Sequence, residues 1–256
     1  MTAPVPSLRA WRQTLTPSLA RRGGGKFQIL VGLALSCVAV PASAQFGGSF
    51  SIQSDDQFRG RSLSEGRPVA TLDISYDSPT GIYLSAAATA VATRHSGLKM
   101  MGYQENIGFA RKVKWDAVVD IGVANSSYTE YFSGGYSADY TEIYAGLIVH
   151  NISAHIHYSP NYFHRNVSTI YADIDGAVRL APKWRLNGHL GLLTQTSGPL
   201  AQSARRTHYD WRLAITRQVG RLDLQLAWTG GGPDSDYYAN RERGHNALTF
   251  AITYAF

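Results

Sequence analysis

The sequence predicts an all-β protein, a single antiparallel up-and-down β-barrel of about 12 strands that spans a membrane. Three observations predict this fold class. After the first 44 residues, apolar and polar residues alternate with a period of two, and no long apolar face appears at helical spacing. The connections between these segments alternate between short and long. The chain ends on Phe256, which closes the most regular of these segments.

Residues 1–44 are predicted to be a signal peptide that is removed. Basic residues precede an apolar run at 27–40, and Pro41-Ala42-Ser43-Ala44 follows as a small-x-small cleavage site. The run is 14 residues long, whereas a helix across a bilayer needs about 20. Residues 45–256 then form one domain, the barrel. The only cysteine, Cys37, lies in the predicted signal peptide, so we expect no disulfide and no thiolate chemistry in the mature chain.

The charge balance argues against a nucleic-acid partner. The whole chain has a formal net charge of +6. Five of its basic residues and none of its acidic residues fall in residues 1–44, which leaves 19 bases and 18 acids in the mature chain. Binding to phosphate needs a surplus of bases on one face, and the mature chain lacks it.

Twelve alternating segments follow the signal peptide. They span roughly residues 48–59, 67–77, 82–94, 102–111, 115–125, 138–150, 152–159, 167–180, 185–195, 206–217, 221–229 and 245–256. The six mature prolines fall in the proposed connections or, for Pro68, at the start of a strand. Proline cannot donate a hydrogen bond to a strand ladder, so these are the positions where it is tolerated.

The connections indicate which rim of the barrel faces which compartment. Those after even-numbered segments are short, as at Ser78-Pro79-Thr80 and Gln218-Val219-Gly220. Those after odd-numbered segments are mostly longer and more polar, as at residues 126–137 and 230–244. Short periplasmic turns, long outer loops and an even strand count are typical of bacterial outer-membrane barrels. Apolar side chains could not fill a soluble barrel of twelve strands, so we expect them to face lipid instead.

The alternation assigns a set of pore-lining residues. At mid-depth it places Asp73, Asp120, His157, Asp173, His189, Arg212 and Asp223. Toward the periplasmic rim it places Lys112, Asp116, Arg179, Arg185 and Arg221. We expect a narrow water-filled pore for small hydrophilic solutes, whose mixed charges give no strong preference for either sign. The alternative is a salt-bridged plug that only stabilises the barrel.

No catalysis, cofactor or metal is expected. His155 and His157 point to one face, but they have no third metal ligand nearby in the sequence. His157 and Ser159 have the spacing of a nucleophile pair in lipid-hydrolysing barrels, yet the alternation turns them toward the lumen and away from lipid. A third hypothesis is a structural or surface-binding barrel, supported by the tyrosine-rich segment Tyr128–Tyr140.

Two stretches resemble known outer-membrane proteins. The alternation that ends on Phe256 resembles the terminal strand through which the barrel assembly machinery inserts its substrates. Near the start of the barrel stand Phe58-Arg59-Gly60, Ser62, Ser64, Pro68 and Gly81-Ile82-Tyr83. With these residues the chain resembles the TorF-type or Gcw_chp family of proteobacterial porin-like proteins. The resemblance implies a channel in a Gram-negative outer membrane, in contact with lipid and lipopolysaccharide, and it carries over no particular solute.

Overall fold

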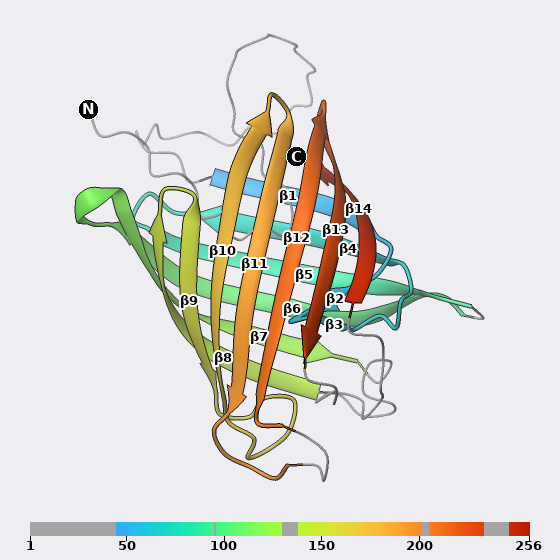
Figure 1. Cartoon of the computed structure of the whole chain (residues 1–256), viewed down its shortest axis with the longest axis vertical. Helices are drawn as coiled ribbons and strands as arrows, with labels where there is room; N and C mark the ends of the chain where they lie inside the picture. Colours follow the sequence, from blue (N-terminus) through green and yellow to red (C-terminus); the bar gives the residue numbers. More distant parts are fainter. Residues whose placement is uncertain (1–44, 95, 130–137, 201–204, 233–245) are drawn as a thin grey trace, which may run out of the picture.

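The computed structural model describes residues 45–94, 96–129, 138–200, 205–232 and 246–256. The predicted signal peptide lies outside the described residues. Twelve strands close into a single antiparallel barrel (Figure 1). They are β1 (Gln45–Gln53), β4 (Val69–Asp77), β5 (Ile82–Thr93), β6 (Gly97–Lys112), β7 (Ala117–Tyr128), β8 (Ala138–Val149), β9 (Ile152–Ser159), β10 (Thr169–Ala181), β11 (Trp184–Gln195), β12 (Thr207–Val219), β13 (Leu222–Gly232) and β14 (Asn246–Ala255). The predicted fold class is confirmed.

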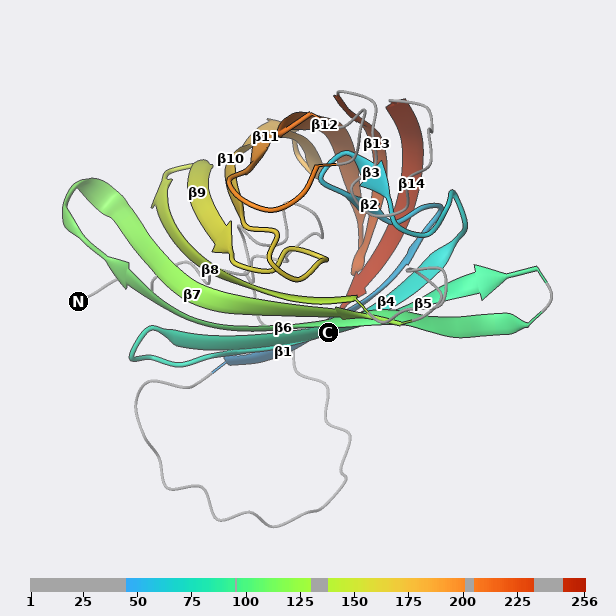
Figure 2. The same ribbon diagram turned by 90° about the horizontal axis from the view of Figure 1, so that it is seen from below.

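Each strand pairs with its neighbours in the sequence, and β1 closes the barrel by pairing with both β4 and β14. In Figure 1 the steep strands β10 to β13 cross the flatter strands β4 to β7 behind them. This crossing follows from the tilt of strands on opposite walls of a barrel. Seen from below, the wall is flattened along β4 to β7 and curls over at β9 to β14 (Figure 2).

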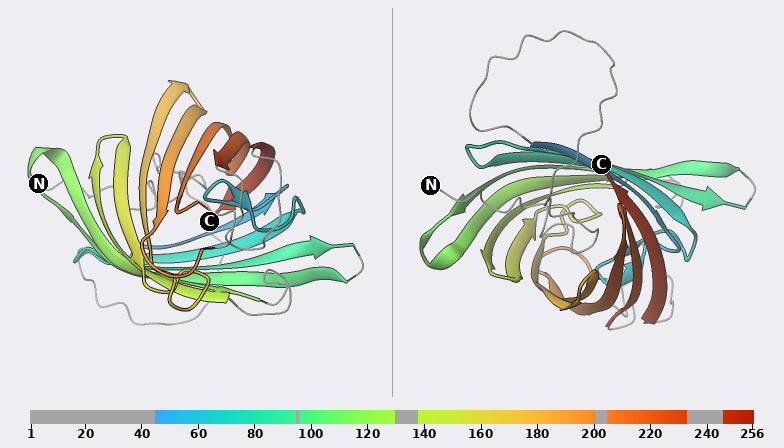
Figure 3. Two further views of the ribbon diagram at one scale, coloured as in Figure 1. Left: turned by 60° about the horizontal axis from the view of Figure 1, so that its bottom comes forward. Right: turned by 90° about the horizontal axis from the view of Figure 1, so that it is seen from above.

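The two rims differ as the sequence predicts. The turns after β6, β8, β10 and β12 lie together at the left and top of Figure 1, where β1 also begins. The β5–β6 hairpin, the loop between β9 and β10 and the end of β13 lie at the opposite rim, as the tilted views also show (Figure 3). Within the described part of the chain, no helix is long and apolar enough to cross a membrane.

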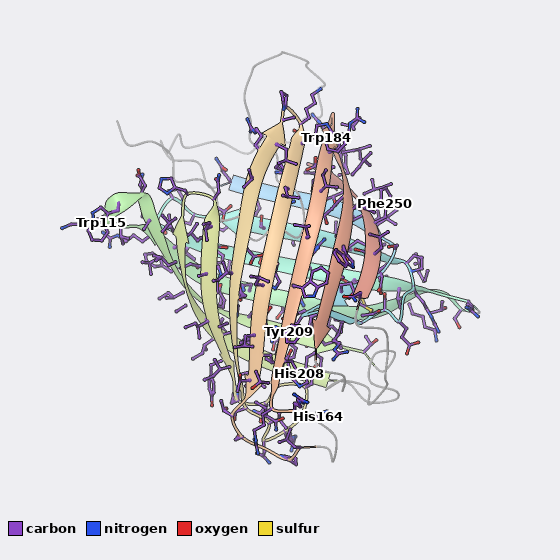
Figure 4. All side chains as sticks on the ribbon, in the orientation of Figure 1. Trp115, His164, Trp184, His208, Tyr209 and Phe250 are labelled. Carbon is purple, nitrogen blue, oxygen red and sulfur yellow. The ribbon has the colours of Figure 1, made fainter. Side chains whose placement is uncertain are left out.

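The barrel is apolar outside and polar inside. Leu190 and Leu248 project outward and expose 64% and 69% of their surface, whereas the inward Asp120 and Thr216 expose 1% each. Trp115 and Trp184 mark the rim with the short turns, and Tyr209 lies near the other rim (Figure 4). A closed wall with this polarity suits a bilayer, because lipid solvates the apolar face and closure leaves no unpaired strand edge.

The first predicted strand is too long. The wall strand β1 ends at Gln53, and residues 54–68, which we call L1, leave the wall. L1 carries a short hairpin of β2 (Gln57–Phe58) and β3 (Arg61–Ser62). The Asp55 carboxylate holds L1 together, because it accepts hydrogen bonds from the hydroxyls of Ser62 and Ser64 at 2.6 Å each. An Asx-type carboxylate of this kind gives the backbone an alternative to the strand ladder.

Candidate functional site

L1 folds into the lumen of the barrel. Its Gly60 has φ +74° and lies against β12 and β13, so close that a Cβ there would approach the Gly230 carbonyl oxygen to 2.7 Å. The lack of a side chain at Gly60 therefore lets the backbone of L1 approach that of β13 closely. Arg59 precedes this turn, at φ +46°, and points toward β8 and β10.

Arg59 anchors L1 to the opposite wall. Its Nη2 donates to both carboxylate oxygens of Glu142 on β8, at 2.8 and 3.0 Å. Its guanidinium lies 3.9 Å from the centre of the Tyr171 ring and 5.1 Å from that of Tyr162. The Arg59 and Glu142 side chains expose only 7% and 6% of their surface. A buried pair supported by hydrogen bonds and aromatic faces holds much more firmly than a surface pair.

An aromatic cluster closes the outer end of the lumen, and we call it the outer plug. It consists of Phe58, Leu63, Tyr128, Tyr140, Tyr162 and Phe163. The loop between β9 and β10 supplies Tyr162 and Phe163, whose ring centres lie 5.0 and 4.7 Å from that of Tyr140. Tyr128 and Tyr140 therefore pack inside the barrel. The surface-binding hypothesis expected them on an exposed loop instead. Residues 130–137 between them lie outside the described residues.

A polar cavity of about 390 Å³ opens below the outer plug. Its charged and histidine side chains on the inner wall and L1 are Arg59, Asp73, Asp77, Asp120, Glu142, His155, His157, Asp173, Asp175, His189, Asp210 and Arg212. Tyr83, Tyr144 and Tyr171 add their hydroxyl groups to the lining. The Tyr83 hydroxyl donates to Asp120 at 2.5 Å, and the Tyr144 hydroxyl donates to Asn106 at 2.9 Å.

Two glycines make room for these tyrosines. A Cβ at Gly122 would lie 2.2 Å from the Tyr144 hydroxyl, and a Cβ at Gly108 would lie 2.1 Å from the Tyr83 hydroxyl. The tyrosines thus lie flat against the bare backbone of β6 and β7.

Histidines and carboxylates alternate along the wall from β7 to β12. His157 Nε2 lies 3.0 Å from Asp173, and His155 lies 3.7 Å from Asp173 and 3.5 Å from Asp120. His189 has one ring nitrogen 2.9 Å from Asp175 and the other 2.9 Å from Asp210. The paired strands β9, β10, β11 and β12 bring these residues together because all occupy inward positions of the alternation.

Among the described residues, one group has the geometry to hold a metal ion. Asp173, Asp175 and His189 each offer a ligand atom, and the three atoms lie within 4.8 Å of one another. Both ring nitrogens of His189 already face carboxylates, so hydrogen bonding accounts for its position. The His157–Ser159 pair does not form a nucleophile site on the outer wall. Ser159 is fully buried and donates to the Thr141 carbonyl at 2.9 Å.

The structure distributes the predicted pore-lining residues over several places. Those at the cavity are Asp73, Asp120, His157, Asp173, His189 and Arg212. Arg185 and Asp223 face inward outside the cavity and form a pair at 3.2 Å. Arg179 opposes Arg185 in the strand register and is exposed near the rim with the short turns.

Two placements on the inner wall are wrong. Asp116 lies in the turn η1 (Lys114–Asp116) after β6 ends at Lys112, and it pairs with Lys112 at 2.6 Å. Arg221 lies in the turn between β12 and β13, where it donates to the Tyr254 hydroxyl at 3.3 Å. In both cases the next strand begins later than the alternation suggested, β7 at Ala117 and β13 at Leu222, so these residues lie in the preceding turn and the inward and outward positions do not apply.

Sequence reasoning missed Arg59, Glu142, Asp175 and Asp210. Asp175 and Asp210 occupy inward positions in strands whose alternation was recognised, so the same pattern could have identified them. Arg59 left no such signal, because it was expected in a wall strand. Its partner Glu142 lies 83 residues away.

Comparison with known proteins agrees with this architecture. The family model described as a bacterial protein of unknown function (Gcw_chp) matches residues 39–256. The chain belongs to the Gcw_chp family. Among solved structures, this Gcw_chp protein resembles the NanC porin at 10% identity, with a TM-score of 0.55, over 83% of this chain and 99% of that one. It also resembles the KdgM porin at 12% identity, with a TM-score of 0.50, over 82% of this chain and 99% of that one. These likenesses show the fold. No curated protein matches the sequence.

Proposed function

We propose that this Gcw_chp protein is a porin-like channel of a Gram-negative outer membrane, which lets small hydrophilic solutes pass through a narrow lumen. The observation that carries the proposal is the cavity with charged walls inside a closed barrel. The outer plug covers the outer end of this cavity, and residues of L1 and of the β9–β10 loop form part of that plug. Loops can move while the wall stays closed. The resemblance of residues 48–90 to TorF-type proteins is consistent with this role.

The proposal also assigns the partners of each surface. Lipid and lipopolysaccharide would cover the exposed apolar belt that includes Ile156, Leu190 and Leu248. The assembly machinery would recognise β14 and Phe256, whose neighbours Phe250 and Ile252 point outward.

Swelling of liposomes that contain the purified protein tests the proposal. We expect swelling in small neutral sugars at a rate that falls as the sugar grows, because the cavity admits only small solutes. Liposomes without protein are the control. A heat-shifted band on an unboiled gel establishes that the barrel is folded. A folded barrel that admits none of the sugars would contradict the proposal.

The second candidate is a barrel that does not conduct and serves a structural or surface-binding role. The outer plug favours it, because Leu63, Tyr162 and Phe163 are almost completely buried among aromatic neighbours. The same swelling assay separates the two candidates, since a permanently closed lumen gives no size-dependent entry.

L1 gives the channel a pH dependence. Burial and the neighbouring Asp55 raise the pKa of Asp56 from 3.8 to about 7, although Arg212 acts in the opposite direction. Because its pKa is raised, protonated Asp56 stabilises the buried, inward position of L1. This stabilisation is complete below about pH 4 and is lost as the pH rises through about 7. We therefore expect a lower conductance at about pH 5 than at about pH 7.5. Asp56→Asn should remove the difference, and an unchanged difference in that variant would contradict the assignment.

A further inference from the structure

The charges that face the cavity are strongly unequal. Seven carboxylates at inward positions line it, from Asp73, Asp77, Asp120, Glu142, Asp173, Asp175 and Asp210, and an eighth, from the exposed Glu105 of β6, borders it. Two guanidinium groups oppose them, from Arg59 and Arg212. The three histidines of the lining, His155, His157 and His189, do not reverse the balance even when all are charged. The described part of the cavity is therefore net negative.

Most of the basic residues that the sequence placed in the lumen lie outside the cavity. Lys112 is held by Asp116 at the rim, and Arg221 lies in a turn. Arg185 is paired with Asp223 outside the cavity. Within the cavity, Arg59 and Glu142 form an ion pair whose two charges cancel, and Arg212 is the other guanidinium of the lining. Among the described residues, the cavity is therefore negative and the rim carries most of these bases.

Residues of the wall already hold one cationic group, the guanidinium of Arg59. Arg59 is a tethered cation, held by a carboxylate on one side and by the Tyr171 ring on another. Asp120 is 99% buried, and its Oδ2 has no hydrogen-bond partner among the described residues, although His155 Nε2 lies 3.5 Å away. A narrow cavity with low-dielectric walls and one sign of charge concentrates ions of the opposite sign.

We propose that the cavity selects cations over anions, so that among charged solutes it favours small inorganic cations and small organic ammonium or guanidinium compounds. This inference rests on the proposed channel function and names its solute class. The prediction of no strong preference for either sign counted the charges of the whole lumen. Here we propose that the charges at the cavity, which lies among the mid-depth acids, decide the selectivity.

The reversal potential across a planar bilayer with a potassium chloride gradient tests the inference. We expect the parent protein to pass K⁺ over Cl⁻ by about tenfold, the lower end of electrostatic focusing in charged clefts. The double variant Asp175→Asn and Asp210→Asn keeps the shape of the two side chains and removes two charges, so its ratio should fall toward one. Asp116→Asn is the matched control, because it makes the same change in an exposed turn, and its ratio should equal that of the parent.

Each outcome distinguishes the inference from the function on which it rests. Conducting channels whose ratio is one or favours Cl⁻ would overturn cation selection and leave the channel function standing. A folded barrel without conductance would overturn both. If the double variant does not fold, the ratio of the parent protein still decides, and the entry of arginine hydrochloride against sodium gluconate in the swelling assay provides the second measurement. Faster entry of gluconate would contradict the inference.

Discussion

Arg59→Ala is expected to release L1 from the lumen and to raise the conductance of the channel severalfold. The substitution leaves the buried Glu142 carboxylate without its partner and removes the cation from the Tyr171 ring. Breaking a buried ion pair by removing one side costs about 3–5 kcal/mol. The substitution therefore destabilises the inward position of L1 and not the barrel wall, because the wall strands keep their backbone hydrogen bonds when L1 moves out.

Limited proteolysis gives a readout of L1 that does not depend on conductance. Arg61 lies in L1 and is partly buried in the inward position. We expect trypsin to cleave after Arg61 faster in the Arg59→Ala variant than in the parent. The double variant Arg59→Ala and Glu142→Ala is the control, because it leaves no unpaired charge and should keep the slow cleavage. Equal conductance and equal cleavage in the parent and the single variant would contradict the role of Arg59 as an anchor.

The second large effect is expected at Gly122, where alanine should destabilise the barrel by about 1–3 kcal/mol. The new Cβ would meet the Tyr144 hydroxyl at 2.2 Å and the Ile107 carbonyl oxygen at 2.6 Å. Tyr144 cannot easily move aside, because its hydroxyl is hydrogen-bonded to Asn106 and to the hydroxyl of Tyr83.

Gly188→Ala provides the matched control for Gly122. Gly188 also lies within a wall strand, on β11, and a Cβ there would meet nothing within 4 Å. The measurement is the temperature at which the heat-shifted band is lost. A lower midpoint for Gly122→Ala with an unchanged midpoint for Gly188→Ala is the expected result. Equal midpoints in the two variants would show that the tyrosines do not depend on the bare backbone of β7.

The sequence determines the barrel wall because the alternation of residues directly decides which face each side chain occupies. Asp120, Asp173 and His189 could be assigned to the inner face for this reason, before any pairing was known. The closure of β1 on β14 follows as well, since an open edge cannot persist in lipid.

The interior of the lumen could not be predicted in the same way. L1 leaves the wall where Asp55 gathers the Ser62 and Ser64 hydroxyls, and periodicity carries no signal for such a local hydrogen-bond hub. The Arg59–Glu142 pair joins residues that are distant in the sequence, and the outer plug combines L1 with the β9–β10 loop. The net charge of the cavity depends on which charged residues lie at the same depth of the lumen. That depth depends on where each strand begins and ends.

The central claim is that this closed barrel conducts ions through its lumen, and single-channel recording of the purified, folded protein in a planar bilayer tests it most directly. We predict discrete and stable conductance steps in the parent protein, which become larger in the Arg59→Ala variant. Silence from both proteins, each with the heat-shifted band of a folded barrel, would contradict the claim and would favour a closed structural or surface-binding barrel.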